Sequence, residues 1–254
     1  MLRYGVGYSA SLSVWGLRYL VNPLVVGPYA GAAAAGYVNL AIRTVESLGF
    51  VQGATFRLSI SALARVQRDR ARLLSAINEG MQLQVLALGP FLVGFVLVAP
   101  WLLPLLLGSS WLPMLQVYPF IALGHIVHGV SNMHTSAFYA RQRNWQITIF
   151  HLVYVALFVG SSLWLVPRMG IIGYGWATVI AMISYGVIHL YTVKEIGTPS
   201  YGLVGSWVLA FGVALFWLEL GWGAWLGLVA VSLWPGTWRA LGGYVRSLRR
   251  EQSK

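Results

Sequence analysis

The chain has 254 residues, of which 58% are hydrophobic and only 9% are charged, and its formal net charge is +11. A soluble domain usually carries about a quarter charged residues, because water has to solvate its surface. This composition excludes an ordinary soluble globular protein and indicates that lipid solvates much of the surface. The absence of cysteine excludes disulfides and thiolate metal sites.

Apolar segments of spanning length recur along the whole chain. A transmembrane helix needs about 20 mostly apolar residues, and a backbone in lipid has to satisfy its own hydrogen bonds. We therefore expect an all-α, polytopic helical membrane protein with about eight transmembrane helices. The expected spans are residues 4–26, 29–56, 78–103, 114–138, 145–166, 171–193, 201–219 and 221–238.

Basic residues are concentrated on one side of these spans. They lie between spans two and three, after span four, after span six and after span eight, whereas the other side holds only Arg168. Lysine and arginine are enriched in cytoplasmic loops, so both termini are predicted to be cytoplasmic. The positive net charge is then explained by the basic cytoplasmic loops that set the orientation of the chain in the membrane, and by their contact with anionic membrane lipids. We therefore expect no nucleic-acid partner.

Three spans carry polar and aromatic side chains at spacings of three and four residues, which places them on one helix face. Helices in lipid bury such stripes against one another or around a shared polar cavity. The stripes are Tyr4, Tyr8, Ser11, Trp15, Arg18 and Asn22; Gly36, Asn39, Arg43, Glu46 and Gly53; and Tyr118, His125, His128, Asn132, Thr135 and Tyr139.

Arg18 and Arg43 lie within predicted spans. A charge at mid-bilayer costs at least about 2.5–3.5 kcal/mol, so such residues usually face a cavity or a partner. Glu46 follows Arg43 by three residues, and an internal ion pair would explain both without a ligand. Arg18 has no acidic neighbour in its own span, which favours an anionic ligand, because a guanidinium offers a planar fork of donors to phosphate.

Catalytic and metal-binding patterns are weak. His125 and His128 stand three residues apart and could share a metal ion, but no third ligand follows at a suitable spacing. Hydrogen bonding between helices is the commoner role for such histidines. With only six acidic residues, no paired carboxylates and no Ser-His-Asp order, we expect no enzyme activity, no metal and no cofactor.

Five short motifs resemble those of a known family in their order and spacing. They are Pro28 to Gly31 with Gly36 to Ala41, the basic stretch Ala64 to Asp69, Leu105 to Trp111, Ala140 to Asn144 and Gly170 to Ala177. Across residues 1–197 they resemble the second six-helix lobe of lipid-linked oligosaccharide flippases. These are the Wzx-type polysaccharide transporters of the MATE-like (MOP) superfamily.

The resemblance implies three parts and a partner. Residues 1–197 would form the C-terminal six-helix lobe, residues 198–238 an additional transmembrane helix pair, and residues 239–254 a basic cytoplasmic tail. Members of the family place two lobes around a central cavity and move substrate by alternating access. A missing N-terminal lobe or a second copy of the chain is therefore implied, in the cytoplasmic (inner) membrane of a bacterium.

The resemblance also implies the substrate, a lipid-linked (undecaprenyl-diphosphate) oligosaccharide destined for a surface polysaccharide such as O-antigen or lipopolysaccharide. Arg18 and Arg43 would hold the diphosphate and Glu46 would orient Arg43. The sugar path would be lined by Trp15, Asn39, His125 and Asn132. Two alternatives stay open: a polymerase or acyltransferase of surface-glycan assembly, with Glu219 or His125 as its essential group, and a truncated or scaffold half-transporter without activity alone.

Overall fold

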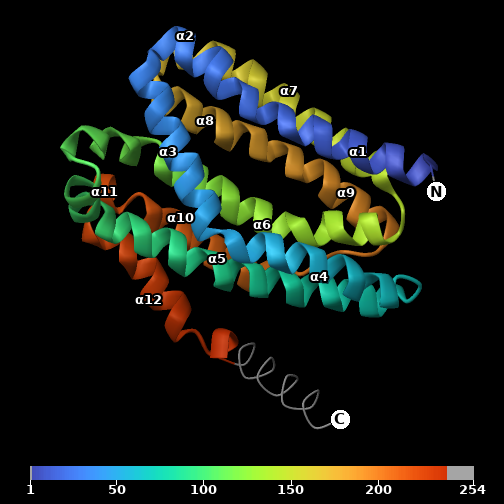
Figure 1. Ribbon diagram of the computed structural model, residues 1–254. Helices are drawn as coiled ribbons and strands as arrows, with labels where there is room; N and C mark the ends of the chain where they lie inside the picture. Colours follow the sequence, from blue (N-terminus) through green and yellow to red (C-terminus); the bar gives the residue numbers. More distant parts are fainter. Residues whose placement is uncertain (1, 239–254) are drawn as a thin grey trace.

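The computed structural model describes residues 2–238, and every regular element in that range is helical (Figure 1). The helices are α1 (Leu2–Gly16), α2 (Gly27–Ala30), α3 (Ala32–Leu48), α4 (Phe50–Val66), α5 (Arg70–Leu106), α6 (Tyr118–Ala140), α7 (Asn144–Met169), α8 (Ile171–Ala181), α9 (Tyr185–Glu195), α10 (Gly202–Leu215), α11 (Trp217–Leu220) and α12 (Leu226–Leu233). Tighter 3₁₀ turns occupy Leu17–Leu20, Ser109–Gln116, Met182–Ser184 and Trp222–Trp225, and a wider π turn occupies Asn22–Val26.

The longest helix, α5, shows how the sequence sets helix boundaries. It begins after Asp69, whose side chain accepts a hydrogen bond of 3.1 Å from the backbone N–H of Arg72. This cap satisfies one of the donors that a helix start leaves unpaired. The helix ends before Gly108, which has a φ of 91°, a conformation that costs glycine least.

In the described residues, three helices are long and apolar enough to cross a membrane: α5, α7, and α8 with α9 taken together as Ile171–Glu195. Ser109–Gln116 and α6 form a fourth span if this pair, bent by 49°, is counted as one. The predicted class of helical membrane protein is thus confirmed. The other four expected spans coincide with interrupted helices (α1, and α3 with α4) or short apolar ones (α10 and α12), and their crossing stays a prediction.

The helices form two packed groups (Figure 1). In one group α1 lies along α7, and α7 packs against α8 and α9. In the other, α6 packs against α4 and α5, and α10 covers α5 and α6. Contacts of α6 with α3, α8 and α9 join the groups, so α6 runs through the centre of the bundle.

The last helices are attached to the bundle by specific contacts. The ring of Phe211 on α10 occupies the notch left by Gly89 on α5. The Trp217 indole N–H donates to the Val96 carbonyl at 3.1 Å, and the Tyr201 hydroxyl lies 3.1 Å from Nε2 of His134. α12 then folds back against α10, so residues 202–233 form a helical hairpin with α11 at its tip.

The basic connections gather at one end of the bundle. Figure 1 places the N-terminus, the α4–α5 turn, the α6–α7 turn and the end of α9 at the same end. The α7–α8 turn, beside Arg168, lies at the other end. This arrangement agrees with the charge pattern of the sequence, while the cytoplasmic location of the basic end stays a prediction. The expected basic tail, residues 239–254, lies outside the described residues.

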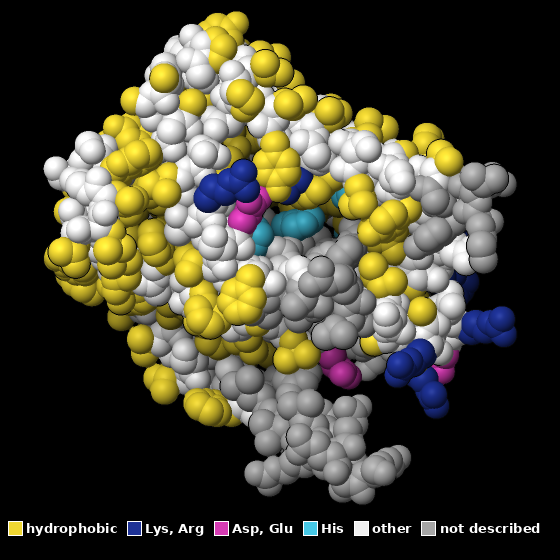
Figure 2. Space-filling model, viewed as in Figure 1, with side chains coloured by type: hydrophobic (Ala, Val, Ile, Leu, Met, Phe, Trp, Pro, Cys, Tyr) yellow, Lys and Arg dark blue, Asp and Glu magenta, His cyan; other side chains and the backbone are white. Residues whose placement is uncertain are grey.

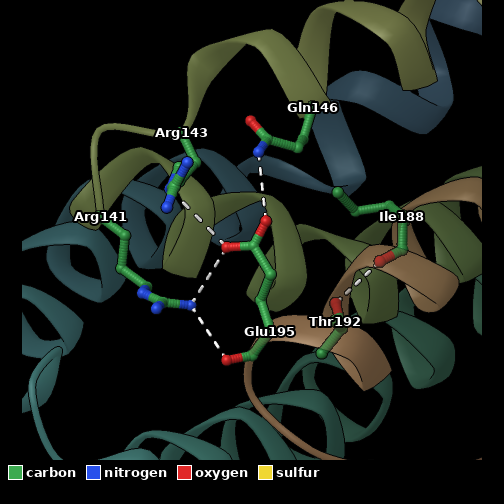
Figure 3. A network of polar contacts seen from close by, with 6 residues as sticks. All are labelled: Arg141, Arg143, Gln146, Ile188, Thr192 and Glu195. Atoms are coloured by element: carbon green, nitrogen blue, oxygen red, sulfur yellow. Dashed lines mark hydrogen bonds and ion pairs between the residues drawn. The ribbon is translucent and has the colours of Figure 1, made fainter.

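A polar cluster ties two connections together at the basic end (Figure 3). Glu195, at the end of α9, pairs with Arg141 at 3.5 Å and with Arg143 at 3.7 Å, both from the α6–α7 turn. Gln146, in the first turn of α7, donates to the same carboxylate at 3.2 Å. The side chains of Arg141 and Glu195 are only 21% and 19% exposed, so the charges are partly withdrawn from solvent.

Glu195→Gln is expected to lower the free energy of unfolding by about 1.5 kcal/mol, the scale of a hydrogen-bonded charge that loses its partner. The measurement is thermal unfolding of the purified chain in detergent. Glu79→Gln removes the same charge from an exposed position on α5, where Ser75 is its neighbour at 3.1 Å, and should change stability little. Equal effects of the two substitutions would contradict a specific role for the cluster.

Candidate functional site

A cavity of about 440 Å³ lies between the two groups of helices. Figure 2 shows this face of the molecule hollowed, with histidine side chains inside the hollow and basic and acidic side chains beside it. The polar and aromatic side chains that line it are Trp15, Arg18, Tyr19, Glu46, Phe50, Gln52, His125, His128, Asn132, Thr135, Tyr139, His151, Tyr154, Phe158, Tyr174, Thr178 and Tyr185. They come from α1 and the turn after it and from α3, α4, α6, α7, α8 and α9.

Most of the predicted site residues meet in this cavity. Those that line it are Trp15, Arg18, Glu46, His125 and Asn132. Arg43 is not among the lining residues, but its guanidinium pairs with Glu46 at 3.7 Å, as the spacing predicts. Asn39 is exposed on α3 and does not line the cavity, so the structure does not bring it to the predicted site.

Arg18 lies at the end of α1, where the chain tightens into the 3₁₀ turn. Its guanidinium donates to the Trp15 carbonyl at 2.8 Å and to the Tyr19 hydroxyl at 2.6 Å. It also lies 4.1 Å from the centres of both aromatic rings. Aromatic faces attract a guanidinium, so these contacts fix its position without neutralising its charge.

Tyr19 connects Arg18 to Glu46 on α3, another helix of the cavity wall. Its hydroxyl accepts from Arg18 and donates to Oε1 of Glu46 at 2.6 Å. The other carboxylate oxygen of Glu46 faces Arg43. Glu46 thus contacts the guanidinium of Arg43 directly and that of Arg18 through the Tyr19 hydroxyl. Two positive charges against one negative charge leave an excess of one positive charge at this side of the cavity.

The Trp15 ring is surrounded by side chains of the protein itself. His128 stacks on it with ring centres 4.6 Å apart and planes within 16°. The rings of His151 and Tyr154 each lie 4.8 Å away, and Arg18 lies over the ring as well. The indole therefore packs against Arg18 and the inner wall of the cavity. These contacts cover part of the ring face that the predicted role of Trp15 in the sugar path would use.

Two of the histidines that line the cavity, His128 and His151, have polar partners in the protein. Nδ1 of His128 lies 3.1 Å from the Tyr185 hydroxyl, and Nδ1 of His151 lies 2.8 Å from the Ser11 carbonyl. His125 packs into the notch at Gly49, where α3 gives way to α4. In the described part of the chain no three histidine, aspartate or glutamate side chains form a group that could hold a metal ion.

The sequence interpretation missed the wall formed by α7, α8 and α9. His151, Tyr154 and Phe158 repeat the spacings of three and four that marked the other stripes, so this signal was present. Tyr174 and Thr178 on α8 are also four residues apart. Tyr19 carried no such signal, because adjacent residues do not share a helix face.

The N-terminal part of the chain matches a family model. Residues 1–116 match the family described as "Polysaccharide biosynthesis protein", and this range contains Trp15, Arg18 and Glu46. No curated protein and no solved structure matches the chain. The similarity of residues 1–116 relates this helical membrane protein to the biosynthesis or export of polysaccharide.

Proposed function

We propose that the chain is one lobe of a transporter that moves an undecaprenyl-diphosphate-linked oligosaccharide across the cytoplasmic membrane of a bacterium. The observation that carries the proposal is Arg18, fixed on aromatic rings at a cavity to which seven helices contribute side chains. The match of residues 1–116 to polysaccharide biosynthesis proteins supports the class of substrate.

The chemistry of the cavity suits a ligand with three different parts. A guanidinium binds diphosphate through paired, charge-assisted hydrogen bonds. Hydroxyl, amide and aromatic side chains such as Asn132, Thr135 and Tyr139 offer hydrogen bonds and ring faces to sugars. Because the cavity is open on one face (Figure 2), a polyprenyl chain could remain in lipid while the polar head enters.

Transport then follows from rocking of this lobe against a partner lobe, either a separate N-terminal lobe or a second copy of the chain. Alternating access about a site near the repeat interface is the usual mechanism of such transporters. The proposal requires no covalent chemistry, cofactor or metal. Loss of the gene should therefore abolish surface glycan while complete lipid-linked glycan accumulates in the inner membrane.

The alternative, a membrane enzyme of glycan assembly, makes a different prediction. Its acidic candidate, Glu219, lies on α11 and is not among the residues that line the cavity. Glu219→Gln is therefore expected to leave both the amount and the chain length of surface glycan unchanged, as measured on gels of glycan from complemented deletion cells. Shortened or unmodified glycan in these cells would favour the enzyme and contradict the transporter.

A further inference from the structure

The contacts of Glu46 suggest a role beyond orienting Arg43. Its carboxylate accepts from Tyr19 at 2.6 Å and pairs with Arg43 at 3.7 Å. Through Tyr19 it also holds the hydroxyl to which Arg18 donates. The carboxylate thus interacts with Arg43 directly and with Arg18 through one hydroxyl. These are the two guanidinium groups that an anionic ligand would need.

These contacts are of a kind that a stronger anion can replace. The side chains of Arg43 and Glu46 are 73% and 32% exposed, and exposed ion pairs are weak. A diphosphate carries more negative charge than one carboxylate, and it can accept paired hydrogen bonds from a guanidinium. Arg18 donates to only two acceptors among the described residues, whereas a guanidinium has five N–H donors.

We infer that Glu46 is a displaceable counter-ion of the Arg18 site, so that a diphosphate group competes with the Glu46 carboxylate for the same positive charges. The inference rests on the proposed function for the class of ligand. A transporter has to release what it binds, and a site that holds its ligand too tightly conducts poorly. The returning carboxylate would favour release.

The test is calorimetric titration of the purified full chain with inorganic pyrophosphate. Glu46→Gln keeps an oxygen that can accept from Tyr19 but removes the competing charge. It is expected to bind pyrophosphate about tenfold more tightly than the wild type, the scale of one charge removed a few ångströms from the ligand. Glu79→Gln, which makes the same charge change on α5 outside the cavity lining, should bind as the wild type does.

The double substitution Arg18→Ala with Glu46→Gln should lose the gain in affinity. Unchanged or weaker binding by Glu46→Gln, or an equal gain with Glu79→Gln, would overturn the inference. A parallel titration with undecaprenyl diphosphate in nanodiscs distinguishes a lipid head group from free pyrophosphate as the ligand. A site built for the lipid should bind undecaprenyl diphosphate more tightly than inorganic pyrophosphate.

Failure of this inference and failure of the proposed function give different results. If Glu46→Gln tightens pyrophosphate binding but glycan export does not depend on Arg18, the counter-ion role stands and the transport role falls. If export depends on Arg18 while Glu46→Gln binds as the wild type does, the transport role stands and the counter-ion role falls.

Discussion

Arg18→Ala is expected to reduce the export of surface glycan by about a hundredfold, the scale of truncating one partner of a close charge pair. The substitution removes the charge that Trp15 and Tyr19 hold at the cavity. Surface glycan is measured on deletion cells complemented with each variant, and the amount of chain in the membrane is measured by immunoblot. Insertion should be unchanged, because removing a cation from a span lowers the cost of insertion.

Arg168→Ala is the matched control for this substitution. Arg168 also lies over a tryptophan, 4.9 Å from the ring centre of Trp164, and it donates to the backbone carbonyl of that residue. It is exposed and does not line the cavity. Export should therefore remain normal with Arg168→Ala, and an equal loss with both variants would show that the effect of Arg18 is not local.

Gly173→Ala is expected to lower the free energy of unfolding by about 3 kcal/mol, the upper part of the range for overpacked interiors. A Cβ at this position would lie 2.5 Å from the Leu165 carbonyl oxygen and 2.8 Å from the Val166 nitrogen. Both are backbone atoms of α7, so no side-chain rotation can relieve the contact, and α7 and α8 would have to separate. The measurement is thermal unfolding of the purified chain in detergent.

Gly160→Ala is the control for this substitution, because Gly160 lies on α7 and the added carbon would meet no atom within 4 Å beyond the backbone of its own helix turn. Alanine favours a helix over glycine by up to about 1 kcal/mol, so this variant should be as stable as the wild type or slightly more so. A similar loss of stability in both variants would show that close approach at Gly173 is not the cause.

The polar stripe of α6 shows what the sequence could predict. His125, His128, Asn132, Thr135 and Tyr139 follow helical spacing, and the structure places all of them at the cavity. The helical class followed from the same kind of reasoning, because lipid leaves a spanning backbone few alternatives. Tyr118, counted in the same stripe, instead donates to the Leu92 carbonyl on α5, where it is buried.

Other features depend on tertiary contacts that spacing does not encode. The first two expected spans are interrupted near Pro23 and at Gly49, and the sequence alone did not distinguish a continuous helix from a broken one. Tyr19 reaches Glu46 across 27 positions only because the 3₁₀ turn follows α1. Similarly, nothing in the sequence distinguishes Gly173 from the other glycines. Its importance for stability comes from the α7 backbone, which approaches it too closely to leave room for a side chain.

The central claim is that the Arg18 cavity carries a lipid-linked glycan from one membrane leaflet to the other. The most direct test is the leaflet position of that glycan in spheroplasts, probed with a glycosidase that cannot cross the membrane. With the wild-type chain the glycan should be cleaved from outside, whereas with Arg18→Ala it should become accessible only in inverted vesicles. The same distribution of glycan with both chains would contradict the claim.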